Sequence, residues 1–370
     1  MEFALHLPIN SVSFGQVSIN ILKEVHKRGL NPFIFSIGPD DFSAFKLSDD
    51  FKLWFNTCKD KGLKSYNRDV PVFKLWHLDD SIQSYGKKQI LFTFHECDQA
   101  TEVETNIVKN NTKVLFSSKY SRDIFQTFGC NNVGNLPLGF DFDSFHVITN
   151  RQYVDTGVIQ FGLAGKLEKR KQHAKIINLW VKKYGNNPKY KLNCALFNPF
   201  LPLDVQNNLV MNAMEGKNYW NVNFLPFMQG NDAYNDFLNS NSIILGLSSA
   251  EGFGLPEFQS VALGKHALIL NATGYREWAT PENSVLVNPM GKISLADGVF
   301  FREGHYLNQG SGFDWSENSF YKGMEEVITR FEANPINEAG LKLQKDFTYE
   351  KTVDKILFEL DQLNSITPII

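Results

Sequence analysis

Cysteine is scarce in this chain, and the few cysteines are far apart in sequence. The 370 residues contain four of them, namely Cys58, Cys97, Cys130 and Cys194, with no C-x-x-C pair. No histidine cluster at ligand spacing accompanies them. This pattern indicates neither a disulfide framework nor a zinc site, so buried, reduced thiols are expected.

Long apolar runs and an excess of one charge are also missing. No stretch reaches the roughly 18 apolar residues of a transmembrane segment, and the N-terminal MEFALHLPIN lacks the features of a signal peptide. The formal net charge is -3, which favours neither nucleic acid nor an anionic membrane as partner. A cytoplasmic protein is therefore expected.

The composition is that of a folded protein with a large core. Apolar residues make up 43% of the chain, and phenylalanine alone occupies 32 positions. Charged residues are near the globular average, which excludes a disordered class. Because the chain exceeds the size at which single cores stop growing, two domains are expected.

Short apolar runs alternate with amphipathic stretches along the chain. Strands are predicted at residues 2–7, 32–37, 72–78, 90–95, 114–117, 158–163, 191–197, 221–225, 242–248 and 266–270. Helices are predicted at 15–28, 117–129, 171–185, 203–215, 231–240 and 256–264. Short buried strands that alternate with helices indicate parallel sheets covered on both faces.

A polar, turn-rich segment at residues 141–157 divides the chain into two halves. This bridge favours two doubly wound sheets that face a central crevice over a single (β/α)₈ barrel, the main competing architecture. We therefore predict an α/β protein with domains at 1–149 and 150–348. The amphipathic helix at about 349–370 is expected to pack back on the first domain.

The segment SSAEGFGLPEFQSVALG, residues 248–264, lies between a predicted strand and a predicted helix. Gly252 and Gly254 permit close backbone approach, and the free amides of the helix N-terminus favour phosphate oxygens. Glu251 beside such a site suggests a ligand with hydroxyl groups as well, such as a sugar attached to a diphosphate. A plain strand-to-helix turn explains the bare tetrapeptide EGFG equally well.

A basic segment, FGLAGKLEKRKQH at residues 161–173, follows another predicted strand. Lys166, Arg170 and Lys171 would place fixed cations where negative charge develops on a diphosphate leaving group. Taken alone, the segment is better interpreted as a solvated basic turn.

Together, the two segments resemble the signature of family 4 glycosyltransferases, enzymes of the two-domain GT-B type. In that family, E-G-F-G-L-P leads into a helix with a second glutamate eight residues after the first. That position is Gln259 here, and Glu257 is out of register with it. The basic segment resembles the family's G-R-L-x-x-x-K element, with Gly165, Lys166 in the arginine position, and Lys171.

The resemblance implies that Glu251 contacts the hydroxyls of the donor sugar. It assigns donor binding to Lys166, Arg170, Lys171, Gly252, Phe253, Gly254, Leu255 and Gln259. Glutamine can still hydrogen-bond ribose hydroxyls, but it carries no charge, so a different nucleotide affinity is expected. Lys166 lacks the bidentate fork of arginine.

Two loops of the first half are candidates for the acceptor side. Gly15 lies between the first predicted strand and helix, where an ordinary turn is the simpler interpretation, but in GT-B proteins this loop faces the donor diphosphate. Thr93, Phe94 and His95 match the family's T-x-H at a strand end. By that resemblance His95 lies near the reacting sugar, although a lone histidine is more often structural.

Three weaker matches involve residues 271–278, 224–234 and 136–145. The first contains Gly274 and Glu277, in places that line the donor site in the family. The second lies where the family binds the base, and the third contains Asp141 in a structural role.

The resemblance implies a metal-independent, retaining glycosyltransferase without a bound cofactor, with Glu251, His95 and Lys171 as catalytic residues. The donor would be a UDP- or GDP-linked sugar, and the acceptor a hydroxyl of a saccharide or another molecule. A non-catalytic nucleotide-sugar binder, which Gln259 supports, and an epimerase or phosphorylase-like enzyme of the same fold remain alternatives. The acidic balance weakens a nucleic-acid acceptor.

Overall fold

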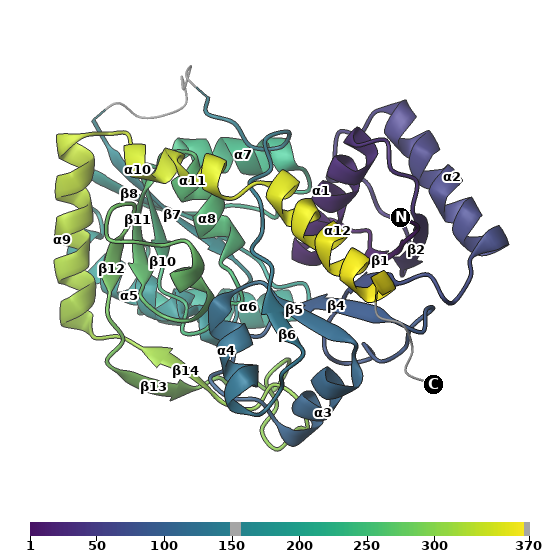
Figure 1. Cartoon of the computed structure of the whole chain (residues 1–370). Coiled ribbons are helices and arrows are strands. Elements are labelled where there is room, and N and C mark those ends of the chain that lie inside the picture. The colour runs from purple at the N-terminus through teal and green to yellow at the C-terminus, as the bar shows by residue number, and fades with distance from the viewer. Residues whose placement is uncertain (149–156, 366–370) are drawn as a thin grey trace.

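The computed structural model describes residues 1–148 and 157–365. It contains two α/β domains, and the end of the chain returns from the second domain to the first (Figure 1). Part of the bridge at 141–157, on which the domain boundary was predicted, lies outside the described residues.

The first domain is a parallel six-stranded sheet in the order β2-β1-β3-β4-β5-β6. Its elements are β1 (Ala4–Pro8), α1 (Ser13–Lys27), β2 (Phe33–Ile37), α2 (Asp49–Ser65), β3 (Val72–Leu75), β4 (Gln89–Thr93), α3 (Glu102–Asn110), β5 (Lys113–Phe116), α4 (Lys119–Thr127) and β6 (Val133–Asn135). Every residue of β4 is buried, as expected for a central strand covered on both faces. Helix α1 buries Val17, Ile21 and Val25, which lie four residues apart on one face.

The second domain contains another parallel six-stranded sheet, in the order β12-β11-β10-β7-β8-β9. Its elements are β7 (Ile159–Gly165), the 3-10 helix η1 (Lys169–Lys171), α5 (His173–Tyr184), β8 (Tyr190–Leu196), α6 (Leu203–Ala213), β9 (Val222–Phe224), α7 (Asn231–Ser240), β10 (Ile243–Gly246), α8 (Leu255–Ala262), β11 (His266–Leu270), η2 (Thr273–Glu277) and β12 (Val285–Val287). An antiparallel hairpin of β13 (Gly291–Ser294) and β14 (Ser311–Asp314) follows. This strand order is the doubly wound one, and it reverses between β7 and β10.

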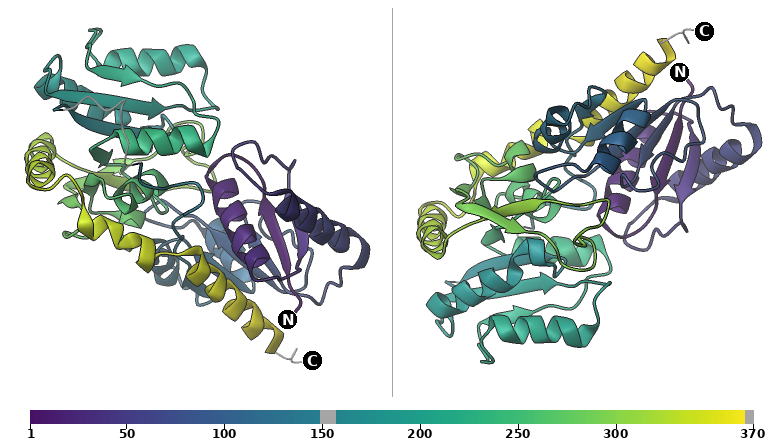
Figure 2. Two further views of the ribbon diagram at one scale, coloured as in Figure 1. Left: turned by 90° about the horizontal axis from the view of Figure 1, so that it is seen from above. Right: turned by 90° about the horizontal axis from the view of Figure 1, so that it is seen from below.

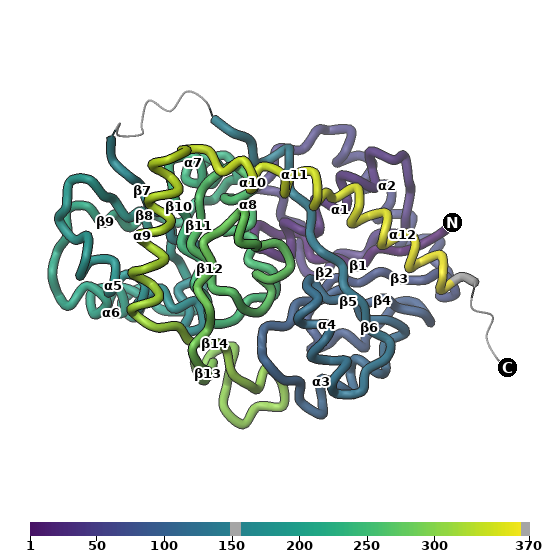
Figure 3. The backbone as a smooth tube through the Cα atoms, turned by 60° about the vertical axis from the view of Figure 1, so that its left-hand side comes forward, coloured from purple at the N-terminus to yellow at the C-terminus, as the bar shows by residue number. Residues whose placement is uncertain are grey.

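The C-terminal helices connect the two domains. They are α9 (Glu317–Ala333), α10 (Glu338–Leu341), α11 (Leu343–Asp346) and α12 (Tyr349–Ser365). Figure 3 shows α10, α11 and α12 running from the second domain to the first, where Arg28, the residue after α1, pairs with Asp354 at 2.6 Å. The chain crosses between the domains at two adjacent points, because Phe140 and Thr348 pair as a parallel bridge.

The two sheets confirm the predicted fold class and exclude a single (β/α)₈ barrel, which would need one closed sheet. The four cysteines are buried free thiols. Among residues 1–148 and 157–365, no helix is long and apolar enough to cross a membrane.

Candidate active site

The strand order places both predicted donor motifs at one point of the second sheet. The basic segment follows β7 and the EGFG segment follows β10, and these two strands are direct neighbours. In open α/β sheets, ligands bind at the carboxyl ends of the strands where the order reverses. The topology therefore brings together two motifs that lie far apart in sequence.

The backbone after β10 turns sharply into helix α8. Gly254 is the residue before the helix and has a φ of 82°, in the left-handed region. A Cβ at this position would lie 2.2 Å from the ring of Tyr275, so only glycine fits. The amide of Gly274 donates to the carbonyl of Glu251 at 2.9 Å, which fixes the loop from the other side.

The turn after β7 is hydrogen-bonded directly to this loop. The amide of Ser249 donates to the carbonyl of Arg170 at 2.7 Å, and the Arg170 guanidinium donates to the carbonyl of Ala250 at 2.8 Å. Gln172 donates from its side chain to Ser249 Oγ. The two motifs therefore form one rigid unit.

Glu251 lies at the centre of a buried ion cluster. Its carboxylate pairs with the ammonium of Lys171 and, at 3.3 Å, with the guanidinium of Arg170. Arg170 also pairs with Glu168 at 2.9 Å and with Glu96 of the first domain at 3.1 Å. The cluster brings together Glu251, Lys171 and Arg170, three of the residues assigned to the donor site from the sequence, and it adds Glu96 and Glu168.

Charge pairing sets the ionisation of this cluster. Burial would raise the pKa of Glu251, but Lys171 and Arg170 outweigh it and lower the pKa to about 2. Burial, with the charge of Lys171, lowers the pKa of the neighbouring His173 to about 3. At neutral pH the carboxylate of Glu251 is therefore charged and the imidazole of His173 is neutral.

Glu257 is the buried acid that the motif alignment placed out of register. It lies in the first turn of α8 with 1% exposure. Burial raises its pKa to about 7, and the charge of Lys171 opposes that rise. A Cβ on Gly254 would lie 3.4 Å from its Oε2. Glu257 therefore lies beneath the glycine turn, close to Lys171.

The other predicted donor residues lie around this centre. Gly252 accepts a hydrogen bond from Ser117 of the first domain at 2.8 Å, and Phe253 accepts one from the Trp278 indole at 2.8 Å. Leu255 begins α8, and Gln259 lies on the same helix with 7% exposure.

Lys166 lies at the rim and not in the cluster. It pairs with Glu168 at 3.6 Å, and its ammonium is 5.5 Å from the ring centre of Phe200 and 5.0 Å from that of Phe300.

Aromatic side chains lie at the carboxyl edge of the first sheet. Phe14, next to Gly15 at the start of α1, packs against His77 at 4.4 Å and Phe94 at 4.9 Å between ring centres. Gly15 itself is close to the backbone of Asn10, where a Cβ would meet the carbonyl oxygen at 1.9 Å. The loop after β1 is therefore tightly folded, and the ring of Phe14 that follows it packs against His77 and Phe94.

His95 is held inside the first domain. Its Nε2 is 3.0 Å from the carbonyl oxygen of Gln99, and its ring packs against Phe125. Burial lowers its pKa, so the ring is neutral. The next residue, Glu96, reaches Arg170 across the domain junction.

The weaker motif matches have mainly structural contacts. Glu277 accepts from the Lys119 amide at 2.7 Å, at the start of α4 in the first domain. Gly274 packs against the backbone of Gly252, where a Cβ would lie 2.4 Å from a carbonyl atom. Asp141 accepts from the amides of Asp143 and Ser144 at 3.1 Å each.

A strap that sequence reasoning missed joins the two domains. It comprises β13, β14 and residues 295–310 between them, and Figure 2 shows it across the domain junction. Asp98 of the first domain accepts from the Ser311 amide at 2.7 Å and pairs with Lys292 at 2.6 Å. Only the glycines of this region hinted at a hairpin.

No family model matches this chain, and no curated protein matches it in sequence. Solved structures match it over nearly its whole length. Sucrose-phosphate synthase from Thermosynechococcus elongatus has a TM-score of 0.69 at 13% identity, covering 98% of each chain. The catalytic domain of starch synthase IV from Arabidopsis thaliana, bound to ADP and acarbose, has a TM-score of 0.68 at 9% identity, covering 98% of this chain and 99% of that one.

A third structure is that of Anabaena HepE in complex with UDP-glucose. It has a TM-score of 0.63 at 12% identity and covers 97% of this chain and 99% of its own. At these identities the likeness establishes architecture. Two Rossmann-like domains in the same arrangement, matched from end to end, show that this protein has the GT-B fold of glycosyltransferases.

Proposed function

We propose that this protein transfers a glycosyl group from a nucleoside diphosphate sugar to an acceptor hydroxyl, with retention of the anomeric configuration. The observation that carries the proposal is the convergence of Lys171 and Arg170 on Glu251 at the N-terminus of α8. Fixed cations and free helix amides stabilise a diphosphate, and an ionised glutamate accepts hydrogen bonds from sugar hydroxyls.

The residues have separate roles in the proposed reaction. The bond from the anomeric carbon to the diphosphate oxygen breaks, and the acceptor oxygen forms the new bond. Lys171, Arg170 and the amides after Gly254 stabilise the charge that develops on the leaving diphosphate. The acceptor proton passes to the departing phosphate. Glu251 orients the sugar, and the aromatic edge around Phe14 receives the acceptor.

Fixed cations also support a reaction that needs no divalent metal. Lys171 and Arg170 are held in fixed positions by carboxylates of the protein itself. We expect activity to persist in EDTA and to be unchanged by Mg²⁺. Activity that is lost in EDTA and restored by Mg²⁺ would contradict this part of the proposal.

The decisive experiment is a donor screen followed by product analysis. UDP- and GDP-linked hexoses are tested for thermal stabilisation, because a ligand that binds the folded state raises the melting temperature. The donors that stabilise the protein are then incubated with saccharide acceptors, and the products are analysed by mass spectrometry and by NMR of the anomeric proton. Binding without turnover would favour the non-catalytic alternative, and an epimerised nucleotide sugar formed without an acceptor would favour the epimerase.

A further inference from the structure

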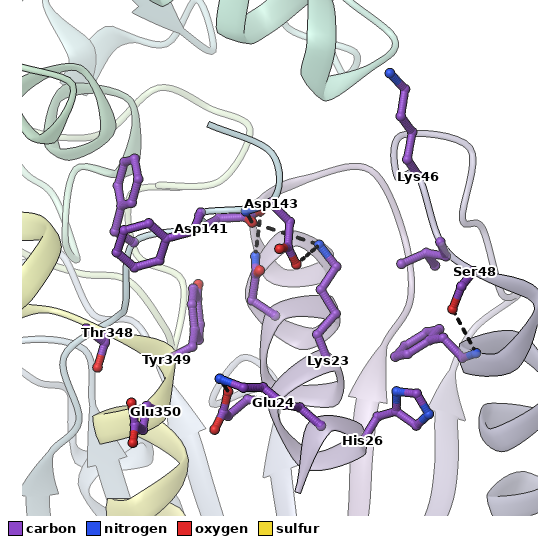
Figure 4. A pocket seen from close by; sticks show the side chains of 16 residues that line it. Lys23, Glu24, His26, Lys46, Ser48, Asp141, Asp143, Thr348, Tyr349 and Glu350 are labelled. Atoms are coloured by element: carbon purple, nitrogen blue, oxygen red, sulfur yellow. Dashed lines mark hydrogen bonds and ion pairs between the residues drawn. The ribbon is translucent and has the colours of Figure 1, made fainter. Parts of the chain in front are cut away.

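A cavity of about 450 Å³ lies beside the two points where the chain crosses between the domains (Figure 4). Its walls come from α1, the start of α2 with the loop before it, residues 140–143 and the start of α12. This hinge pocket is separate from the ion cluster around Glu251. Its volume is in the range of pockets that bind small molecules.

The floor of the hinge pocket is built from buried, ordered groups. Asn20 and Asp141 are 6% and 4% exposed, and the Asn20 amide donates to Asp141 at 3.0 Å. Tyr349 stands beside them, and burial raises its pKa well above the ordinary value, so its hydroxyl keeps the proton. The floor therefore offers hydrogen-bonding groups in fixed positions.

Most charged side chains of the pocket are paired with one another or with neighbours. Lys23 points from α1 toward Asp143, at 3.2 Å, and Asp141, at 3.9 Å, as Figure 4 shows. Lys27 pairs with Glu24 at 3.5 Å. Three lysines and four carboxylates line the pocket in all. The lining therefore carries a net of one negative charge, which disfavours an anion, and a charged ligand would have to compete with the existing ion pairs.

An open aromatic ring lies among these paired charges. Phe142 is 55% exposed, and its ring packs edge-on against Phe140 with 5.1 Å between centres. Sugar rings present C–H faces that pack on aromatic rings, and hydroxyls that both donate and accept hydrogen bonds. Such hydroxyls can join the Lys23 ion pairs without breaking them. A neutral saccharide therefore fits this lining better than an anion, a cation or a zwitterion.

We propose that the hinge pocket is a second ligand site, distinct from the donor site, and that it binds a neutral saccharide. Both crossings of the chain between the domains contribute to its walls. Lys46 at its rim pairs with Asp232 of the second domain at 2.5 Å. A ligand in the pocket would therefore contact the segments that join the domains. Its binding would be linked to any domain rotation that accompanies donor binding.

The test measures saccharide binding to the nucleotide-free, full-length protein by saturation-transfer NMR. Maltotriose, cellotriose and chitotriose are the probes. We expect binding of at least one of them, and an affinity about two- to tenfold lower in Phe142→Ala, the scale of one lost aromatic contact. Asp143→Ala, a second variant at an exposed position of the lining, is also expected to bind the trisaccharide more weakly. Phe358→Ala is the matched control, because Phe358 is similarly exposed, at 56%, on α12.

The double variant Lys171→Met/Glu251→Gln separates the two sites. It alters the donor site, and the hinge pocket is expected to bind the same trisaccharide with unchanged affinity. The proposal is wrong if none of the three probes binds, or if binding is lost in the double variant and kept in Phe142→Ala. Because no nucleotide sugar is present, the result does not depend on whether the protein transfers sugars.

Discussion

The carboxyl edges of the two sheets differ in chemistry although the sheets are built alike. The edge of the second domain holds a buried cluster of charges around Glu251, Lys171 and Arg170. The edge of the first domain carries Phe14, Phe94 and the neutral His95. In doubly wound folds the topology decides where a ligand binds, and the residues after each strand decide the chemistry of that position.

This contrast assigns different tasks to the two edges. Burial of a charge is costly unless a partner compensates it, and the second domain supplies partners for each charge in the cluster. The aromatic edge has no such cost, and under the proposed function it provides flat apolar surfaces for the acceptor. The strap of residues 291–314 holds the two edges together. Four predictions can break or sharpen the comparison, and they are ordered by the size of the expected effect.

The largest effect is expected for Lys171→Ala. Loss of the cation at the leaving diphosphate should lower kcat about 10²- to 10³-fold, the scale seen when one stabilising donor is removed. The variant also leaves Glu251 with Arg170 as its remaining partner, so lower stability is expected as well. Steady-state kinetics with saturating donor and acceptor, together with thermal melts, measure both.

The double variant Lys171→Met/Glu251→Gln is the control for that loss of stability. It removes both charges of the pair and should melt close to the wild type while remaining inactive. Wild-type kcat in Lys171→Ala would sink the assignment of the charged edge to the diphosphate.

A smaller effect is expected for Phe14→Ala at the aromatic edge. One aromatic contact is worth about 0.5–1.5 kcal/mol, so KM for the acceptor should rise up to about tenfold while KM for the donor stays constant. Val12→Ala, an exposed position of the same loop, is the matched control. A rise in the donor KM alone would show that this edge does not receive the acceptor.

The strap should limit hydrolysis of the donor. Asp98→Asn weakens the pairing with Lys292 and the bond from the Ser311 amide, so water should enter more readily. The ratio of donor hydrolysis to transfer is expected to rise about two- to fivefold, measured by nucleotide release with and without acceptor. Lys292→Ala should change the ratio less, because an exposed ion pair contributes at most about 1 kcal/mol. An unchanged ratio in Asp98→Asn would exclude this role.

The smallest effect concerns Glu257 and pH. Its folded pKa of about 7 lies above the ordinary 4.5, so the protonated form stabilises the fold below pH 4.5 and this contribution is lost as pH rises through 7. Glu257→Gln removes this dependence. Relative to the wild type, the melting temperature of this variant should rise by a few degrees between pH 5 and pH 8. A constant difference across this range would mean that Glu257 does not titrate there.

Local patterns account for most of the predicted elements. The predicted strand HALIL matches β11 residue for residue, and the predicted helix at 231–240 matches α7. They agree because burial on a sheet or on one helix face imposes a short repeat on the sequence. Helices α2 and α3 were missed. The 17 residues of α2 bury only Phe51, Phe55, Cys58 and Gly62, so the periodic signal is weak. Helix α3 is short and is fixed by a capping box between Thr101 and Glu104.

The sequence by itself determined the fold class, the position of the two donor motifs at strand ends and the identity of the charged residues. Tertiary structure alone decided that Glu96 and Glu168 complete the ion cluster and that Lys166 lies at its rim. It also decided that a strap joins the domains and that the hinge pocket lies beside the crossings of the chain. The physical reason is range. Periodicity and turn chemistry act over a few residues, whereas ion pairs and cavities depend on distances between segments that meet only when both sheets have formed.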